Sequence, residues 1–173
     1  MRKEYGQALR ALFEKAMSQQ LPAFTPTKVG SDYLFPGERA FRKRIEGVAD
    51  LWIVLSPNQK MDEFSVELGW SRLARFPELV MRPSLQRPYE AFNETEYMCR
   101  LGELAFGKDH WWVVEKFRAP RNVEDLVASL GKLSAQVASE RVKPKVDEAV
   151  ATLMEKGIPY LEEVVAKLAS AER

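Results

Sequence analysis

The chain has 173 residues, 46% of them hydrophobic and 29% charged, an ordinary composition for a globular protein long enough to bury one substantial core. Its 26 basic and 25 acidic side chains nearly cancel, so no global field draws it to nucleic acid or to an acidic membrane. The single cysteine excludes an intrachain disulfide, and no stretch approaches the roughly 20 apolar residues of a membrane span.

The first half of the chain predicts one helix followed by three strands. Apolar residues recur at helical spacing over residues 5–19, and Pro22 ends that helix. The period of the pattern then changes to two, which predicts strands at residues 41–45, 48–55 and 64–70. Because the connections between these strands are short, we expect an antiparallel meander.

The middle of the chain predicts irregular structure. Three prolines between residues 71 and 96 deny any long regular element, so we expect a long loop there, of the kind that often carries function. Residues 96–104 fit either a strand or a short helix, and the pattern leaves this choice open. Residues 111–117 predict a short strand.

The C-terminal part predicts helices over about residues 122–171. Asn122 is the expected N-cap of the first one, and Pro144 is expected to interrupt it. Gly157 has the spacing of a residue that ends a helix, and Pro159 that of the first residue of a final helix.

Together these elements predict a single α+β domain over residues 1–173. We expect an antiparallel sheet of four to five strands, packed against the N-terminal helix and two to three C-terminal helices. The N-terminus is charged and polar and lacks the apolar core of a signal peptide, so a cytoplasmic protein is expected.

Residue types that commonly carry catalysis are scarce in this sequence. His110 is the only histidine and Cys99 the only cysteine, too few soft ligands for a structural zinc site. The sequence holds no Gly-x-Ser-x-Gly nucleophile motif and no glycine-rich phosphate loop. A lone cysteine in an apolar run is more often a buried hydrophobe than a nucleophile. We therefore expect no metal and no cofactor, and we assign no catalytic residue.

Candidate binding residues lie on the polar face of the predicted sheet and at a tryptophan pair. Arg42 and Arg44 share one face of a strand, and Glu67 projects from the polar face of the third strand, so a cross-strand ion pair or a polar pocket floor is expected. Trp111 and Trp112 face opposite sides if they share a strand, so only one of them enters the core. The candidate binding residues are Arg42, Arg44, Glu67, Arg100 and Trp112.

Four short motifs follow one another along the chain. They are a Val-polar-Leu-Gly element at residues 66–69, an Arg-apolar-Gly-x-Leu element at 100–104, the Trp pair at 111–112, and a Gly-apolar-Pro element at 157–159. The ordered set resembles the bacterial family catalogued as domain of unknown function 4304. Glu67 departs from that family, in which Asn is common at the position. The resemblance implies no catalytic residues, because the family has none established, and some related small bacterial families look like immunity proteins against toxins.

Three functions stay open at the level of sequence. The lack of a catalytic constellation and the long loop rich in Arg and aromatic residues favour a non-catalytic module that binds a protein partner, in the manner of an immunity protein. The second is an enzyme with an Arg and carboxylate pocket. The third is a weak nucleic-acid binder through the basic strand and loop, which the sequence does not favour because no base-stacking or helix-turn-helix motif is present.

Overall fold

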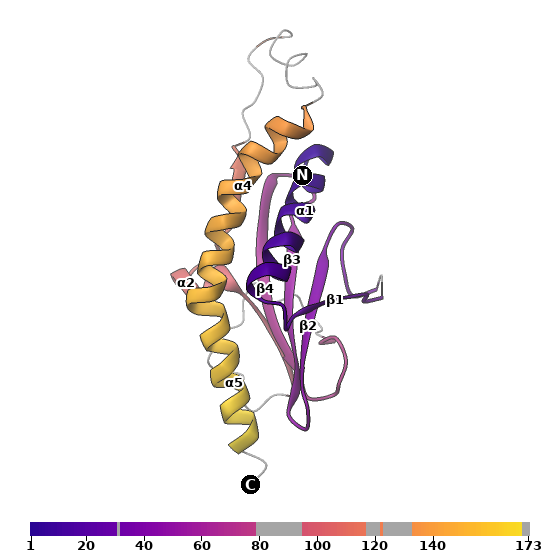
Figure 1. The fold of residues 1–173 in the computed structure, drawn as a ribbon, viewed down its shortest axis with the longest axis vertical. Helices are drawn as coiled ribbons and strands as arrows, with labels where there is room; N and C mark the ends of the chain where they lie inside the picture. The colour runs from indigo at the N-terminus through magenta and orange to yellow at the C-terminus, as the bar shows by residue number, and fades with distance from the viewer. Residues whose placement is uncertain (31, 79–94, 117–121, 123–132, 171–173) are drawn as a thin grey trace.

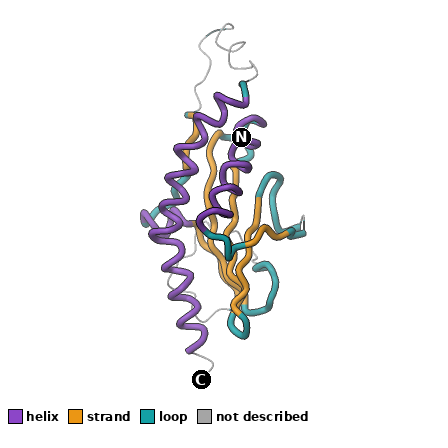
Figure 2. Tube along the Cα trace, viewed as in Figure 1, coloured by secondary structure: helices purple, strands orange, loops and turns teal. Residues whose placement is uncertain are grey.

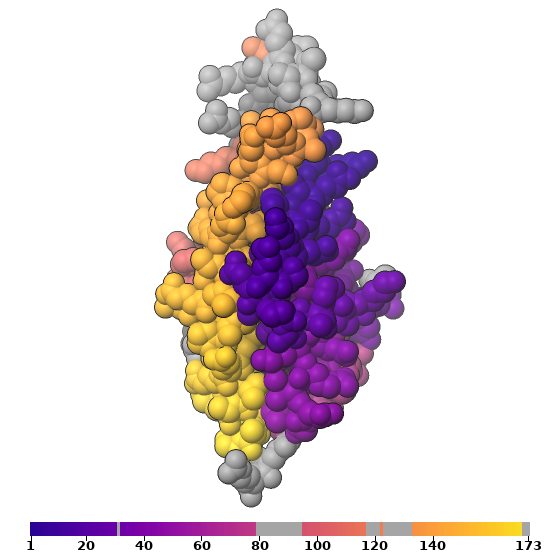
Figure 3. Space-filling model, viewed as in Figure 1, coloured from indigo at the N-terminus to yellow at the C-terminus, as the bar shows by residue number. Residues whose placement is uncertain are grey.

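The structure is a computed structural model that describes residues 1–30, 32–78, 95–116, 122 and 133–170. An antiparallel sheet forms one layer and the helices from the two ends of the chain form another, so the predicted α+β class is confirmed (Figures 1 and 2). The N-terminal and C-terminal helices contact each other over the same face of the sheet, and Figure 3 shows them as one continuous surface.

The centre of the sheet is the expected meander. Strands β2 (Arg39–Ile45), β3 (Ala49–Pro57) and β4 (Asp62–Ser71) pair in sequence order, so the three predicted strands are confirmed, with bounds that differ from the predicted ones by at most two residues. A short strand that the sequence pattern did not indicate, β1 (Thr25–Thr27), pairs with β2 at the edge of the sheet. Pro26 suits this place, because an edge strand needs no hydrogen-bond donor on its outer side.

Two further strands share the other edge of β4. β5 (Glu96–Arg100) pairs with the C-terminal half of β4, and β6 (Trp112–Glu115) pairs with its N-terminal end. Between them the chain forms the short helix α2 (Leu101–Phe106). The segment 96–104 is therefore strand first and helix afterwards, with the change at Arg100, whose extended backbone precedes the first turn of α2.

The C-terminal helix is continuous at the positions where the sequence predicts breaks. Helix α4 (Ala135–Thr152) runs through Pro144, and a π-helical turn (Leu153–Gly157) joins it directly to α5 (Ile158–Ser170). The predicted interruption at Pro144 is wrong, and so is the predicted helix end at Gly157.

The π-helical turn explains how the helix passes Pro159. In an α-helix a proline ring clashes with the carbonyl four residues earlier. Proline also lacks the backbone N–H that would donate a hydrogen bond to that carbonyl. Here the N–H of Ile158 bonds to the carbonyl of Leu153, five residues back, which widens the turn just before the proline. Gly157 is buried in that turn, where an added Cβ would lie 2.7 Å from Leu153 Cδ1 and 3.2 Å from Leu101 Cδ1. Glycine therefore lets the helix approach α2 closely.

The start of α4 differs from the expected one. The described helix begins after Ser134, whose side-chain Oγ accepts the N–H of Val137 at 3.2 Å as an N-cap. The expected cap, Asn122, is followed by residues 123–132, which lie outside the described residues.

Among the residues that the structure describes, no helix has both the length and the apolarity needed to cross a bilayer.

The main core fills the space between the helices and one face of the sheet. Helix α1 (Lys3–Gln20) contributes a buried stripe and packs against α4. Trp112 is 1% exposed and stacks on Phe64 at a ring-centroid distance of 5.8 Å. The largest fully buried side chains of this core are those of Tyr5, Leu9, Phe13, Met17, Phe41, Ile53, Leu55, Phe64, Leu68, Trp70 and Trp112.

Candidate functional site

The face of the sheet turned away from the helices, here called the polar face, carries ordered rows of side chains. Pairing across β2, β3, β4 and β5 gives the rows Ala40–Val54–Glu67–Arg100, Arg42–Trp52–Gly69–Met98 and Arg44–Asp50–Ser71–Glu96. A further row beside them joins Glu38, Ser56 and Ser65. The buried polar side chains of the described residues all lie in these rows, and they are Glu38, Asp50, Ser56, Ser65, Glu67 and Ser71.

One end of the polar face fixes the loop before β2. The buried Glu38 carboxylate accepts the Ser56 hydroxyl at 2.6 Å and the backbone N–H of Phe35 at 2.7 Å. These charge-assisted bonds hold the 32–38 segment against the sheet. Ser65 lies opposite Ser56 and is fully buried, but its Oγ has no hydrogen-bond partner within the described part of the chain.

At the other end of the polar face, the Asp50 carboxylate contacts two of the predicted site residues. Arg44 donates to both oxygens of Asp50, at 2.9 and 3.2 Å, and Arg42 lies 3.6 Å from the same carboxylate. The hydrogen bond to Asp50 raises the pKa of Arg44. Asp50 is not among the predicted site residues, although a single carboxylate inside an apolar strand is itself a signal, because a buried charge needs a partner.

Arg100 and Glu67 face each other across β4 and β5. The guanidinium of Arg100 binds Asp109 through Nη1, at 2.7 and 2.6 Å, and lies 4.6 Å from the ring of Trp111. Arg100 therefore fixes the turn between α2 and β6. Glu67 is 2% exposed on the same face.

The structure separates the predicted site residues into two groups. Arg42, Arg44, Glu67 and Arg100 all lie on the polar face, whereas Trp112 lies in the main core on the opposite face. Arg42 and Arg44 line different hollows, and neither hollow is lined by Glu67 or Arg100 among the residues described. The five residues thus do not surround one cavity in the described part of the chain.

Arg42 lines a pocket of about 250 Å³ that we call the Trp52 pocket. Trp52 is 2% exposed and meets Phe76 edge-on, with ring centroids 5.1 Å apart, and Phe76 lies 6.2 Å from the ring of Tyr33. The guanidinium of Arg42 lies 5.7 Å from the Trp52 ring. The pocket is lined by Thr27, Lys28, Val29, Gly30, Tyr33, Arg42, Trp52, Arg75, Phe76 and Glu78.

Hydrogen bonds hold the rim of the Trp52 pocket in place. The indole Nε1 of Trp52 donates to the carbonyl of Arg75 at 3.2 Å. The side chain of Arg75 binds both oxygens of Glu96, at 2.9 and 3.1 Å, and one oxygen of Glu78 at 2.9 Å. The hydroxyl of Tyr33 also donates to Glu78, and this bond raises the pKa of Tyr33. The hydrogen bond from Arg75 lowers the pKa of Glu96.

Two cations of the Trp52 pocket are not used in this way. Arg42 and Lys28 donate no side-chain hydrogen bond to any residue that the structure describes. Arg42 makes a 3.6 Å ion pair with Asp50 and lies 5.7 Å from the Trp52 ring. Their N–H groups are therefore available to a bound molecule. Of the residues of this pocket, Arg42 and the loop that carries Arg75 and Phe76 were predicted from the sequence to be functional, whereas Tyr33 and Trp52 were not.

The two side chains with the strongest intrinsic reactivity lie elsewhere. Cys99 is fully buried in the main core, and this burial raises the pKa of its thiol to about 12, so the thiol stays protonated at neutral pH. The ring of His110 packs between those of Phe106 and Trp112, at centroid distances of 4.5 and 5.1 Å. Among the described residues, no group of three or more His, Cys, Asp and Glu side chains is arranged to hold a metal ion.

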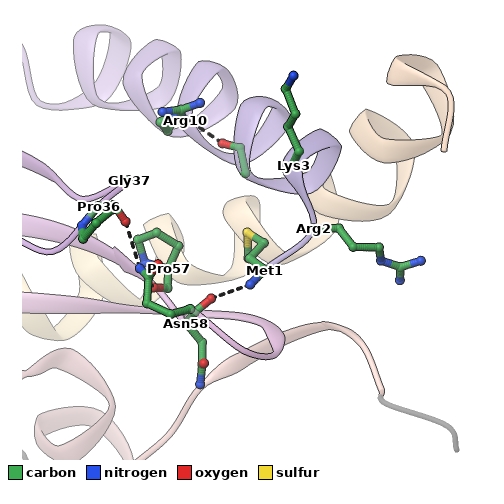
Figure 4. Close-up of a pocket in the computed structure, with 10 residues that line it drawn as sticks. Met1, Arg2, Lys3, Arg10, Pro36, Gly37, Pro57 and Asn58 are labelled. Atoms are coloured by element: carbon green, nitrogen blue, oxygen red, sulfur yellow. Dashed lines mark hydrogen bonds between the residues drawn. The ribbon is translucent and has the colours of Figure 1, made fainter. Parts of the chain in front are cut away.

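A third, smaller hollow of about 140 Å³ lies at the start of α1 (Figure 4). The amino group of Met1 donates to the carbonyl of Asn58 at 2.6 Å, and Pro36, Gly37 and Pro57 form the opposite wall. In Figure 4 the charged ends of Arg2 and Lys3 point away from this hollow. None of the described residues that line this hollow is aromatic, whereas the other pocket brings together Trp52, Tyr33 and Phe76, so the Trp52 pocket is the stronger candidate site.

Comparison of the chain with family models, with curated proteins and with solved structures finds no match. The resemblance to domain of unknown function 4304 therefore stays a prediction. What the Trp52 pocket binds has to be inferred from its own chemistry.

Proposed function

We propose that this chain is a binding module that holds a protein partner at the Trp52 pocket and performs no bond chemistry. Trp, Tyr and Arg are the residue types that contribute most binding energy at protein interfaces, and all three meet here. At about 250 Å³ the pocket is smaller than the roughly 300–1,000 Å³ typical of sites for drug-sized ligands. A space of this size suits one or two side chains of a partner.

The observation that carries the proposal is that the pocket is held in shape before any partner binds. Arg75 ties the pocket to Glu96 and Glu78, and its carbonyl holds the Trp52 indole. A site whose side chains are already ordered loses less conformational entropy on binding. A protein that blocks a partner, as an immunity protein does, needs such a surface and no reactive group.

Exposed apolar side chains extend the surface beyond the pocket. Tyr33 is 40% exposed and Phe35 is 54% exposed on the loop before β2, and Leu73 is 51% exposed on the loop after β4. These two loops also supply Tyr33, Arg75, Phe76 and Glu78 to the pocket. Apolar side chains that flank a polar and aromatic anchor site are a feature of protein-binding surfaces.

The charges of the polar face support a protein partner over nucleic acid. Arg44, Arg75 and Arg100 are each bound to a carboxylate, those of Asp50, Glu96 and Asp109. An arginine that already binds a carboxylate contributes little net attraction to a phosphate backbone. The basic strand and loop therefore carry much less available positive charge than the sequence indicates.

Site-specific photocrosslinking tests this proposal. A photoreactive amino acid replaces Tyr33 at the rim of the pocket in one protein and Met154 on the helical layer in another, two positions that are each 40% exposed. After irradiation in lysate from the native host, we expect one discrete protein adduct from position 33 and none of that mass from position 154. The same adducts from both positions, or none from position 33, would contradict the proposal.

A further inference from the structure

We infer that the partner segment that enters the Trp52 pocket is acidic, with a carboxylate side chain next to an aromatic one. This inference rests on the proposed function and adds the chemistry of the ligand. It comes from the difference between the cations of the pocket that are already bound and those that are not.

Several charged side chains at the pocket already bind one another in the free protein. Glu78 accepts hydrogen bonds from Tyr33 and Arg75, and Arg75 uses its remaining donors on Glu96. An incoming cation would have to compete with Arg75 for Glu78, the one carboxylate among the described residues that line the pocket. Binding a positively charged side chain would therefore break contacts that the free protein already makes.

Two charged side chains of the pocket make no hydrogen bond to the residues that the structure describes, and both are positive. Lys28 is exposed, and the side chain of Arg42 is 34% exposed, with a 3.6 Å ion pair to Asp50 and no hydrogen bond within the described residues. An incoming carboxylate can accept hydrogen bonds from Arg42 and Lys28 without displacing any bond within the described residues. Arginine also matches a carboxylate through two parallel N–H bonds, which makes this contact directional.

The apolar wall of the pocket accounts for the second part of the ligand. Phe76, Tyr33 and Val29 line the space beside Arg42, and Trp52 closes its base. Aromatic rings pack edge-to-face at such surfaces with centroid distances of about 4.5–7 Å, the arrangement that Trp52 and Phe76 already show. A ring on the partner, adjacent to its carboxylate, can continue this packing.

Short peptides of matched shape test the inference on the full-length protein. The probes are the capped dipeptides acetyl-Glu-Phe-amide, acetyl-Gln-Phe-amide and acetyl-Lys-Phe-amide, titrated while the indole N–H signal of Trp52 is followed by NMR. A Trp52→Phe variant assigns that signal. We expect the Glu peptide to bind about tenfold more tightly than the Lys peptide, with the Gln peptide between them, the scale expected for one charge-assisted hydrogen bond.

Variants of the two pocket cations, with a control on β2, separate the effect of the pocket from that of the overall charge of the protein. Arg42→Ala should remove the preference for the Glu peptide, Arg42→Lys should keep part of it, and Lys28→Ala should reduce it. The control is Arg39→Ala, because Arg39 is on the same strand but faces α1, where it binds Glu14. This control should leave all three affinities unchanged. The fold should also be unchanged in each variant, which the amide NMR spectrum reports.

Three results would overturn the inference. The first is a Lys peptide that binds as tightly as the Glu peptide, and the second is no shift of the Trp52 signal with any probe. The third is a single-stranded oligonucleotide that displaces the Glu peptide and loses this ability in Arg42→Ala. If the discrete crosslink from position 33 is still seen, these results reject the acidic ligand and leave the protein-binding function standing.

Discussion

Two serines that face each other on the polar face differ in their hydrogen bonding. Ser56 donates to the buried Glu38 carboxylate, and Ser65, its neighbour on β4, has no partner among the described residues. Both side chains are buried, at 5% and 0% exposure. The pair therefore separates the effect of a buried hydrogen bond from that of a buried hydroxyl at nearly the same place.

We expect opposite outcomes when each of these serines is replaced by alanine. Ser56→Ala should lower the free energy of unfolding by about 1–3 kcal/mol, because Glu38 loses a bond to its buried charge. Ser65→Ala should leave stability within about 0.5 kcal/mol of the wild type or raise it, because no bond is lost and a buried hydroxyl is removed. Urea unfolding of both variants measures this, and equal losses would show that Ser65 has a partner.

Cys99 is expected to be chemically silent in the folded protein. Its thiol is fully buried, and burial raises its pKa to about 12, so the reactive thiolate is scarce at pH 8. Reaction with a disulfide reagent at pH 8 should be at the rate of protein opening in buffer and fast in guanidinium chloride. A fast reaction in buffer would mean that the thiol is accessible, contrary to its place in the core.

At the scale of single residues, the sequence predicts the face of the sheet on which a side chain lies better than it predicts the residue that the side chain binds. Alternation on β2 placed Arg42 and Arg44 on one face correctly, because side chains alternate along any strand. The carboxylate that binds them depends on which residues the register sets opposite, and Asp50 was not singled out for that reason. Trp112 entered the core, and Trp111 lies beside Arg100, which agrees with the expectation that they separate.

At the scale of elements, the helices show where local signals mislead. Gly157 and Pro159 have the spacing of a helix end and a helix start, but the chain continues through both by means of the π-helical turn. Pro144 lies on the exposed side of α4, whose buried stripe of Ala138, Val142, Val146 and Ala149 packs in the core. That burial offsets the roughly 3 kcal/mol cost of a proline in a helix, a balance that local sequence does not reveal.

Two helical glycines give the prediction at this scale. Gly6→Ala in α1 should raise the free energy of unfolding by about 0.5–1 kcal/mol, because an added Cβ meets only Met1 Sδ at 4.0 Å. Gly157→Ala should lower it by about 1–3 kcal/mol, because the Cβ would crowd Leu153 at 2.7 Å in the turn against α2. Thermal unfolding of both variants measures these changes in stability. A stabilised Gly157→Ala would contradict the close packing of the turn.

At the scale of the whole molecule, one carboxylate joins three elements. Glu115 on β6 binds Arg2, Tyr5 and Arg141, which come from the two ends of the chain. Arg2 also binds Asp62 at the start of β4. The hydrogen bond from Tyr5, with help from Arg2, lowers the pKa of Glu115. Because its pKa is lower in the folded than in the unfolded protein, Glu115 stabilises the fold most above its ordinary pKa of about 4.3.

This linkage predicts an acid-dependent difference between two proteins. Glu115→Gln should be less stable than the wild type at pH 7. The difference should shrink as the pH falls below about 4.3, because the unfolded wild-type chain then takes up a proton at Glu115 while the folded protein, with its lower pKa, keeps the carboxylate ionised. Glu162, which is exposed on α5, supplies the control, since Glu162→Gln should differ little from the wild type at either pH. Urea unfolding at pH 7 and pH 3.5 measures both, and a difference that grows on acidification would contradict the role given to Glu115.

The overall architecture could be predicted because its signals are long: alternation over three strands and helical spacing at both ends of the chain. The Trp52 pocket could not, because it joins the loop before β2, the middle of β3 and the loop after β4. Such a site exists only once the register sets Arg42 beside Trp52, and a single sequence carries no record of that pairing.

A calorimetric titration tests the central claim most directly. The partner identified by crosslinking is purified and titrated into three proteins. Wild type and Arg39→Ala should bind it with the same affinity, and Arg42→Ala should bind it at least about tenfold more weakly, since a charged anchor at an interface is worth more than about 1.4 kcal/mol. Unchanged binding by Arg42→Ala, or an equal loss in Arg39→Ala, would show that the partner does not use the Trp52 pocket.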